Sequence, residues 1–261
     1  MIKICSLFSG SSGNSTYIET DTAGVLLDCG VSMKRILSEL ERIGKKREDI
    51  KALFITHEHI DHIMSVGPIA RGWKIPVYAT AGTWRAMYRG LGQIDKSLIR
   101  IAEEGKKVSV GDLEITPFAI YHDAAQPVAY CFESGGKKLT VITDIGKMDD
   151  KIFISLSGSD AVLLEANHDI KMLENGRYPY SLKKRIRGMY GHLSNEEAAL
   201  TCARLAALGT KTFLLGHLSE ENNTAQIALE TVRSTIENSC SKGSFVFEVL
   251  ERGKHGELIT V

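Results

Sequence analysis

The segment ITHEHIDH, residues 55–62, decides how this sequence is interpreted. It places three histidines and an aspartate in the pattern H-x-H-x-D-H directly after the apolar run IKALF. Residues two apart in an extended chain point the same way, so His57 and His59 can bind one metal ion. Asp61 and His62 follow as the chain turns into a helix, and they face a second position nearby. A polar loop with chance histidines is the alternative, but histidine is scarce and this spacing suits ligands.

Other ligand-type residues also follow apolar runs. His122 comes after EITPFAIY, Asp144 after KLTVIT and His217 after KTFLLG. Each of them alone could be a satisfied residue at the edge of a sheet. Strand ends are, however, where a rigid sheet can hold ligands while the loops around them stay free. Together with the H-x-H-x-D-H segment, these residues therefore indicate a single site.

The donors of this expected site are nitrogen and carboxylate oxygen, without a thiolate. Such a set suits Zn²⁺ or Mn²⁺, with Fe²⁺ as a further option, better than Ca²⁺. The set is too large for one tetrahedral ion. It is the right size for two ions roughly 3.5–4 Å apart, bridged by one carboxylate and a hydroxide.

Composition sets limits on location and partners. The 261 residues are 43% hydrophobic, which allows a sizeable core. The formal net charge of zero argues against attraction of the whole molecule to nucleic acid or membrane, and leaves room for a local basic patch. Five cysteines without a C-x-x-C, and no membrane-spanning or leader segment, indicate a cytoplasmic protein. No membrane association and no obligate protein partner are expected.

One domain over residues 1–261 is the simplest organisation, because no linker, repeat or low-complexity tract divides the chain. SMKRILSELERIG, residues 32–44, predicts a helix, and the capping-box spacing of Ser194 and Glu197 predicts the start of another. The runs FVFEVL and ELITV can form a final hairpin. Both halves of the chain have several strands and then helices. We therefore expect an α/β (α+β) protein with two packed sheets and helices outside.

At these residues the sequence resembles the metallo-β-lactamase superfamily. The resemblance covers nearly the whole chain through Asp28 in LLDCG, THEHIDH, His122, Asp144 in ITDIG and His217 in LLGHLS. It implies an αββα four-layer sandwich with the metal ions at one edge, and two ligand sets. One ion would be held by His57, His59 and His122, the other by Asp61, His62 and His217, with Asp144 as the bridge. Asp28 looks like the carboxylate that orients the ligands; a buried structural aspartate is the alternative.

Some segments narrow the resemblance further. The ligand set of histidines and aspartates without a cysteine is similar to that of the superfamily's phosphodiesterase and nuclease branches and to that of glyoxalase II. SGSSGNS, HDAAQPVAY, LLEANHD, YPYSLKKRI and GHLSNEEAA together resemble the WalJ (YycJ) group, which implies a metal-dependent exonuclease acting from DNA 5′ ends. The short interval between Asp144 and His217 leaves no space for a β-CASP insertion. Because no long flexible arm is present, tRNA 3′ processing of the ribonuclease Z kind is not expected.

The expected mechanism is in-line attack on phosphorus by the bridging hydroxide. Asp28 and Asp61 count among the catalytic residues with His192, which lies in GHLSNEEAA. That segment resembles the ribonuclease Z motif with a catalytic histidine. His192 would give the leaving oxygen a proton or a positive donor, unless it is only a turn residue. Ser194 begins a helix whose free amides could bind a phosphate oxygen.

Substrate contacts are expected from two further segments. The first is SGSSGNS, in which backbone amides with Ser11, Ser12 and Asn14 would bind phosphate, although a plain hairpin loop explains it nearly as well. The second is the basic run, which would track a nucleic acid backbone or be a solvated helix face. The run is residues 183–187, of which Lys183, Lys184 and Arg187 are the expected contacts, and Tyr178 just before it could stack on unpaired bases.

Three other functions remain open from the sequence. A small-molecule phosphodiesterase acting on cyclic or nucleotide phosphodiesters would use the same ligands. The basic run argues for a polymer, because a polymer needs contacts beyond the scissile phosphate. A thioester hydrolase of the glyoxalase II type and a metal-binding regulatory module are the others.

Glu165 and His168 are expected in the surroundings of the metal ions or at the rim of the site.

Overall fold

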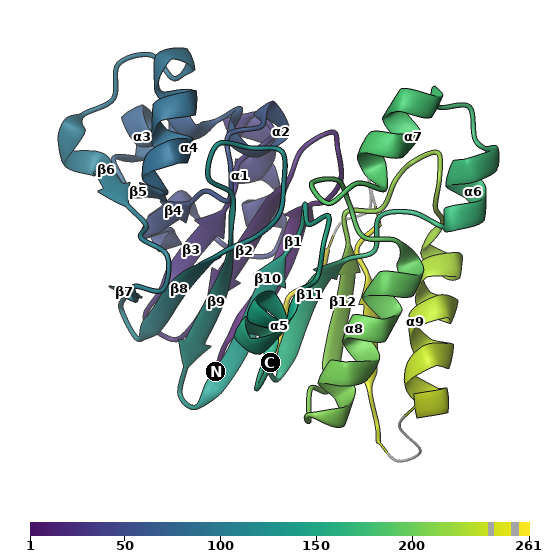
Figure 1. The fold of residues 1–261 in the computed structure, drawn as a ribbon. Coiled ribbons are helices and arrows are strands. Elements are labelled where there is room, and N and C mark those ends of the chain that lie inside the picture. Colours follow the sequence, from purple (N-terminus) through teal and green to yellow (C-terminus); the bar gives the residue numbers. More distant parts are fainter. Residues whose placement is uncertain (240–242, 252–255) are drawn as a thin grey trace. The chain divides into compact units, whose positions relative to one another are not determined.

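The computed structural model describes residues 1–239, 243–251 and 256–261 (Figure 1). Contacts between Cα atoms divide the chain into two compact units. Unit 1 comprises Met1–Ala119, Ala124–Lys137 and His255–Val261, and unit 2 comprises Ile120–Asp123 and Lys138–Lys254.

A seven-stranded mixed sheet forms the centre of unit 1, in the order β14-β1-β2-β3-β4-β5-β6. The strands β14, β1, β2 and β3 are antiparallel neighbours, and β3 to β6 run parallel. Its strands are β1 Lys3–Phe8, β2 Ser15–Glu19, β3 Gly24–Leu27, β4 Ala52–Phe54, β5 Val77–Ala79, β6 Ile99–Ile101 and β14 Ile259–Thr260. Strands β2, β3 and β4 are buried throughout. For β3 and β4, which pair in parallel, this burial explains why their sequences GVLL and ALF are continuous apolar runs.

Helices of unit 1 bury apolar side chains in the core that the sheet also lines. Ile36 and Leu40 of the first helix are completely buried, as the spacing of its apolar residues predicts. This helix ends just before Gly44, whose φ of 75° is left-handed and costs glycine little. The helices are α1 Met33–Arg42, α2 Ile60–Ile63, α3 Val66–Trp73 and α4 Ala81–Met87, with 3₁₀ turns η1 Arg47–Asp49, η2 Tyr88–Gly90 and η3 Lys96–Leu98.

Three further strands of unit 1 form an antiparallel ribbon. They are β7 Val108–Val110, β8 Leu113–Ala119 and β9 Val128–Ser134. Tyr130 of β9 is completely buried, its ring lies edge-on to Phe54 of β4, and its hydroxyl donates to the Ile55 carbonyl at 2.9 Å. The ribbon thus packs on the seven-stranded sheet where β4 leads into the histidine segment.

Unit 2 is built on four strands in the order β13-β12-β11-β10, all parallel. They are β10 Lys137–Ile142, β11 Ala161–Glu165, β12 Thr212–Gly216 and β13 Val246–Val249. Every residue of β11 is buried, as expected for a central parallel strand. Because the strands are parallel, residues after their carboxyl ends lie at one edge of the sheet.

The helices of unit 2 are α5 Asp150–Leu156, α6 Ile170–Asn175, α7 Tyr180–Ile186, α8 Asn195–Ala207 and α9 Ala225–Ser239. The predicted start of α8 is confirmed. The Ser194 hydroxyl accepts from the Glu197 amide, and the Glu197 carboxylate accepts from the Ser194 amide, which is a complete capping box.

The predicted C-terminal hairpin is wrong. Strand β13 pairs parallel with β12, whereas β14 pairs antiparallel with β1. The two runs are close in sequence and both have strand-like composition, but each finds an open sheet edge elsewhere. Among the described residues, no helix is both long enough and apolar enough to cross a membrane.

Candidate metal centre

In unit 1 the site residues follow directly after parallel strands, as predicted. Asp28 comes after β3, and its φ of 61° is left-handed, which is uncommon for a residue other than glycine. His57 comes shortly after β4 and is completely buried. The left-handed backbone at Asp28 is strained, and such strain persists only where surrounding contacts hold it.

The Asp28 carboxylate is held by three bonds. It accepts from the Thr56 amide at 2.9 Å and the Thr56 hydroxyl at 2.8 Å, and it lies 2.8 Å from Nδ1 of His62. A carboxylate at Nδ1 selects the tautomer with the proton on that nitrogen, so Nε2 of His62 presents its lone pair. This geometry is the one expected of an orienting carboxylate. Thr56 was not predicted as a site residue, because its place before His57 is the one feature that marks it in the sequence.

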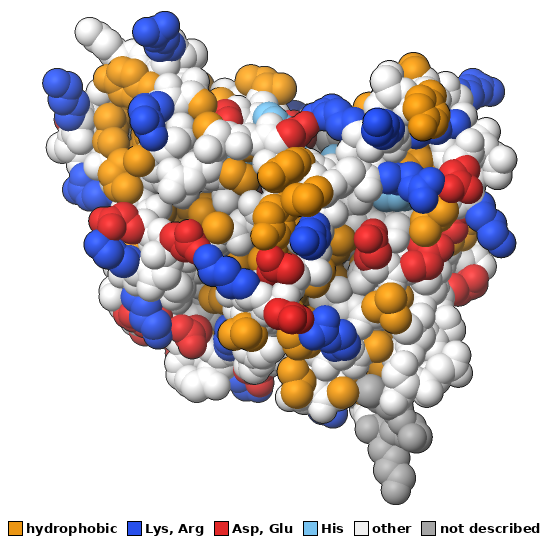
Figure 2. All heavy atoms as spheres, viewed as in Figure 1, with side chains coloured by type: hydrophobic (Ala, Val, Ile, Leu, Met, Phe, Trp, Pro, Cys, Tyr) orange, Lys and Arg blue, Asp and Glu red, His pale blue; other side chains and the backbone are white. Residues whose placement is uncertain are grey.

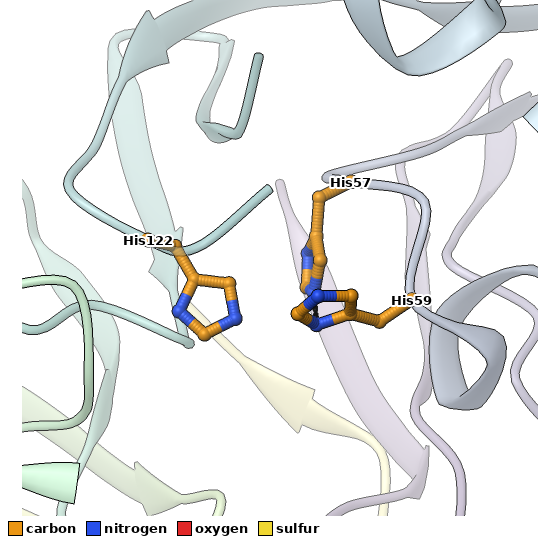
Figure 3. Close-up of side chains that lie close together, drawn as sticks. All are labelled: His57, His59 and His122. Carbon is orange, nitrogen blue, oxygen red and sulfur yellow. Dashed lines mark hydrogen bonds between the residues drawn. The ribbon is translucent and has the colours of Figure 1, made fainter. Parts of the chain in front are cut away.

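His57 and His59 point toward one another (Figure 3). Nε2 of His57 lies 3.1 Å from Nδ1 of His59, and their rings are nearly perpendicular at 80°. Two nitrogens bound to one tetrahedral zinc at 2.0–2.1 Å are about 3.3 Å apart, so this spacing fits shared ligands. The Thr56 hydroxyl lies 3.0 Å from Nδ1 of His57, which leaves Nε2 of that ring for the ion.

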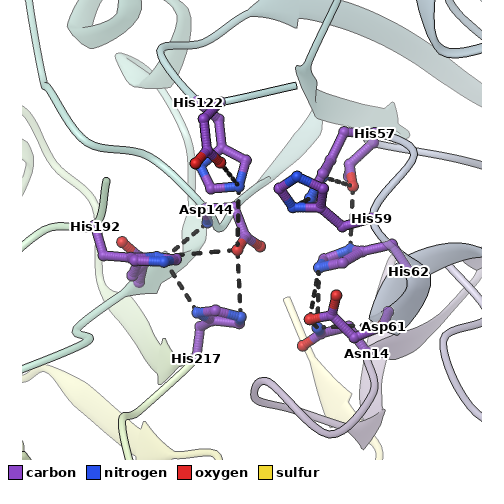
Figure 4. Close-up of polar contacts among 12 residues, drawn as sticks. Asn14, His57, His59, Asp61, His62, His122, Asp144, His192 and His217 are labelled. Atoms are coloured by element: carbon purple, nitrogen blue, oxygen red, sulfur yellow. Dashed lines mark hydrogen bonds and ion pairs between the residues drawn. The ribbon is translucent and has the colours of Figure 1, made fainter. Parts of the chain in front are cut away.

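Asn14 is buried beside the same cluster. Its Nδ2 lies 3.0 Å from Nε2 of His62 and 3.4 Å from a carboxylate oxygen of Asp61, and its Oδ1 accepts from the Gly10 amide at 2.9 Å (Figure 4). The loop that carries it joins antiparallel β1 and β2. Asn14 therefore touches two predicted ligands, a contact that the sequence alone did not indicate.

The remaining residues of this loop are placed differently. Ser11 and Ser12 are exposed. The Asn14 amide donates to the Asp61 carbonyl at 2.8 Å, and the Gly13 amide donates to the Gly10 carbonyl at 2.9 Å. These two amides thus already donate to carbonyl groups of the chain. A phosphate contact through Ser11 and Ser12 stays a prediction.

In unit 2, Asp144 and His217 follow β10 and β12 with left-handed φ angles of 57° and 54°. Oδ1 of Asp144 lies 3.3 Å from Nε2 of His217 and 3.8 Å from Nε2 of His122 (Figure 4). All three residues are buried. One carboxylate oxygen between two imidazole nitrogens is the arrangement that a bridging ligand needs.

Glu165, at the end of β11, is the buried acceptor that organises the ligand-type residues of unit 2. Its carboxylate accepts from the Asp144 amide at 2.8 Å and from the Leu193 amide at 2.7 Å. One oxygen also lies 3.2 Å from Nδ1 of His217. Glu165 therefore fixes the tautomer that leaves Nε2 of His217 facing Asp144. It was expected only in the surroundings of the site or at its rim, because its partners lie far away in sequence.

His192 joins this group. Its Nδ1 lies 3.1 Å from a carboxylate oxygen of Glu165 and 3.9 Å from Oδ1 of Asp144. Burial acts to lower the pKa of His192, but the Glu165 carboxylate, assisted by Asp144, raises it to about 9. Burial likewise acts to raise the pKa of Glu165, and His192 and His217 outweigh it and lower that pKa to about 2. Each of the two groups therefore stabilises the charged form of the other.

Two nearby residues are more structural. His168 is buried and forms a bridge with Ser194, and burial lowers its pKa. The hydroxyl and amide of Ser194 are both bonded within the capping box. A phosphate contact by Ser194 itself stays a prediction. His255, which the sequence predicts to be an exposed turn residue, lies outside the described residues.

The basic run lies on α7, where Figure 2 shows Lys and Arg side chains interspersed with acidic ones. Lys183 donates to the carbonyls of Glu174 and Gly176 at 2.8 and 2.7 Å, and Arg187 pairs with the Glu174 carboxylate. Lys184 is exposed and Tyr178 is half-buried. The cations therefore differ in their roles, although the sequence presents them as equivalent.

One member of the run that was not singled out as a contact is Arg185. Its guanidinium pairs with Asp123 at 2.6 Å, and Asp123 lies 3.4 Å from Nε2 of His122. Arg185 is thus tied to the neighbour of a predicted ligand. The sequence shows only that it belongs to a basic run.

Each of the two units carries donors that fit a divalent metal ion. In unit 2, donor atoms of Asp144, Glu165, His192 and His217 all lie within 4.8 Å of one another. Unit 1 supplies His57, His59, Asp61 and His62, whose facing atoms are nitrogen and carboxylate oxygen. Nitrogen and carboxylate donors of this kind are typical of Zn²⁺, Mn²⁺ and Fe²⁺ sites.

This fold and this donor set define a class of metal-dependent hydrolases. The chain belongs to the β-lactamase superfamily, because the family model described as "Beta-lactamase superfamily domain" matches residues 24–218. The Zn²⁺-bound PqqB structure from Methylobacterium extorquens aligns with a TM-score of 0.75 at 17% identity, covering 99% of this chain and 100% of that one. The predicted metallo-β-lactamase fold is confirmed, and with it the implication of divalent metal ions.

Sequence relatives narrow the family. The chain is 43% identical over 228 residues to the exodeoxyribonuclease WalJ of Streptococcus pneumoniae, covering 87% of this chain and 85% of the relative. It is 39% identical over 245 residues to the exodeoxyribonuclease YycJ of Bacillus anthracis, covering 94% and 92%. The predicted kinship with the WalJ (YycJ) group is therefore confirmed.

Proposed function

We propose that this protein is a metal-dependent exodeoxyribonuclease that hydrolyses DNA from 5′ ends. The observation that carries this proposal is the 43% identity to an exodeoxyribonuclease over 87% of the chain. The buried histidine and carboxylate donors supply the chemistry that phosphodiester hydrolysis needs. DNA as the substrate is consistent with action in the cytoplasm, the location expected from the sequence.

Two divalent ions, Zn²⁺ or Mn²⁺ with Fe²⁺ as a further option, are proposed for the site. Residues 1–261 would then act as one hydrolase domain. The proposed ligands are His57, His59 and His122 for one ion, and Asp61, His62 and His217 for the other, with Asp144 shared. When bound, such ions lower the pKa of a water and neutralise charge on a phosphoryl group during in-line attack.

The chain's own residues complete the reaction. Asp28 and Glu165 fix the tautomers of His62 and His217, so the nitrogens that would bind metal are held in place. Glu165 raises the pKa of His192 and so favours its protonated form. We assign to it the proton that the leaving oxygen requires.

Substrate contacts are proposed where cationic or polar groups are exposed. Lys184 would pair with phosphates, and Ser11 and Ser12 would donate hydroxyls to a phosphate oxygen. Lys183 and Arg187 already have partners on the chain, so their contribution to binding would require these partners to be exchanged.

The test is a nuclease assay with purified protein and Zn²⁺ or Mn²⁺. The substrates are 5′- and 3′-labelled single- and double-stranded DNA and RNA, together with bis(p-nitrophenyl) phosphate. We expect mononucleotides to be released from the labelled 5′ end of DNA, and chelation by EDTA to abolish the release. Asp144→Asn should be inactive, which excludes a contaminating nuclease. Cleavage of the small ester without degradation of any polymer would refute the nuclease and favour a small-molecule phosphodiesterase.

A further inference from the structure

Two tyrosines of unit 2 lie close to each other beside the site histidines. Tyr121 immediately precedes His122, and Tyr190 comes two residues before His192. Their ring centroids are 6.2 Å apart with an interplanar angle of 58°. Tyr190 is 54% exposed, although an aromatic pair that serves packing alone is normally buried.

Tyr121 is held firmly. Its hydroxyl donates to the Asp149 carboxylate at 2.9 Å, and its carbonyl accepts from the Gly146 amide at 2.9 Å. Asp149 is itself the N-cap of α5 and accepts from the Ile152 amide. The ring therefore has a fixed position on the start of a helix.

Tyr190 lies in a turn whose backbone packs closely against Gly146. The turn is closed by bonds from the Gly191 amide to the Gly188 carbonyl and from the His192 amide to the Ile186 carbonyl, both at 2.8 Å. A Cβ atom on Gly146 would lie 2.5 Å from the Met189 carbonyl oxygen. Gly146 thus connects the backbones of both tyrosines, which makes the pair pre-organised.

A cation accompanies the pair. Nζ of Lys147 lies 5.5 Å from the centre of the Tyr121 ring, and the Lys147 side chain is exposed. Exposed aromatic rings next to a positive charge are what proteins use to bind single-stranded nucleic acid, because bases stack on the rings and the cation attracts phosphate. Stacking needs an unpaired base, since bases inside a duplex already stack on their neighbours.

We propose that Tyr190 and Tyr121 form a stacking platform for an unpaired nucleobase adjoining the phosphate that is cleaved. The substrate is then a single-stranded or frayed DNA end and not a fully paired terminus. The platform rests on the proposed function, because it presumes that nucleic acid enters the site. Tyr190, the more exposed ring, contributes the larger part of the stacking surface.

Binding without cleavage tests the platform directly. The metal-loaded protein is titrated into a single-stranded oligonucleotide that has 2-aminopurine at its 5′ end and a methylphosphonate at the first linkage. We expect the fluorescence to be quenched on binding. Tyr190→Ala should weaken binding roughly 5- to 150-fold, as the loss of one stacked base predicts, and Tyr190→Phe should keep it. Tyr88→Ala removes a tyrosine that is 42% exposed in unit 1 and serves as the control.

A cleavage assay separates the platform from the proposed function. Tyr190→Ala should lower kcat/KM on single-stranded DNA, with a smaller effect on a blunt duplex clamped by G·C pairs. If the wild type degrades DNA and Tyr190→Ala binds and degrades single strands equally well, the platform is refuted and the nuclease stands. If the wild type cleaves no DNA but Tyr190→Ala still loses oligonucleotide binding, the nuclease fails and the platform stands.

Discussion

The Glu165 carboxylate lies 3.1 Å from Nδ1 of His192 and accepts from the neighbouring Leu193 amide with its other oxygen at 2.7 Å. Glu165→Gln replaces one acceptor oxygen by an NH₂ group that must face a donor. We expect the free energy of unfolding to fall by about 1–3 kcal/mol, because a buried partner is left unsatisfied. We also expect DNA turnover to fall roughly 10- to 100-fold, since His192 and His217 lose their orienting group.

The matched control for this change is Glu196→Gln, which alters an exposed carboxylate at the start of α8. It should match the wild type in urea unfolding and in turnover. Wild-type stability and turnover in Glu165→Gln would mean that the carboxylate is not the organising group of unit 2.

Much of the site could be predicted because it obeys a local rule. Asp28, His57, Asp144 and His217 each follow an apolar strand, and the carboxyl ends of parallel strands meet at one sheet edge within each unit. The capping box of α8 is equally local, since Ser194 and Glu197 are three residues apart. Such features need only the sequence of a few neighbouring residues.

Features that depend on distant partners could not be predicted. Nothing in the final runs shows that β13 completes a parallel sheet beside β12 whereas β14 joins β1. Glu165 gains its role from residues 21 to 52 positions away, among them Asp144 and His217. The four cations of the basic run look alike in the sequence and differ only through their partners on other elements.

A pH-dependent contribution to stability is expected from Glu19, which is buried at the end of β2. Burial acts to raise its pKa, but bonds from Lys45 and the Tyr17 hydroxyl outweigh it and lower the pKa below its ordinary value. A lowered pKa means that the contribution is present above the unfolded-state pKa and is lost as pH falls through the folded-state pKa. Glu19→Gln should therefore cost about 1 kcal/mol at pH 7 and progressively less below pH about 4.

Urea unfolding of Glu19→Gln between pH 3 and pH 8 measures this dependence. Glu103→Gln is the control, because Glu103 pairs with Lys106 on the surface and such pairs contribute little. A difference from the wild type that stays constant across this pH range would contradict the assignment to the carboxylate charge.

Lys183 and Lys184 are adjacent lysines with different roles. Lys183 bonds to the carbonyls of Glu174 and Gly176 at the C-terminal end of α6, whereas Lys184 is exposed. Lys183→Met should lower the free energy of unfolding by about 1 kcal/mol, and Lys184→Met should leave it unchanged. Lys184→Met should instead make the slope of log K against log salt concentration for single-stranded DNA less steep by about 0.7. Equal destabilisation by both changes would remove the distinction.

Asn14 should anchor the loop between β1 and β2. Asn14→Ala removes the acceptor for the Gly10 amide and the donor that faces His62 and Asp61. We expect a loss of about 1–3 kcal/mol and faster hydrogen exchange at the Gly10 amide. Ser12→Ala, an exposed change in the same loop, should alter neither quantity. Unchanged exchange at Gly10 in Asn14→Ala would show that other contacts hold the loop.

Gly146→Ala should disturb the turn that carries His192. The added Cβ would lie 2.5 Å from the Met189 carbonyl oxygen, closer than real contacts allow, and the obstacle is backbone that cannot rotate away. Overpacking of this kind costs about 1–3 kcal/mol, and DNA turnover should fall with it because the turn must move. Gly90→Ala is the control, since its Cβ would meet nothing within 4 Å. If urea unfolding and turnover of Gly146→Ala both equal those of the wild type, the turn has room to adjust, and neither His192 nor Tyr190 depends on this glycine for its position.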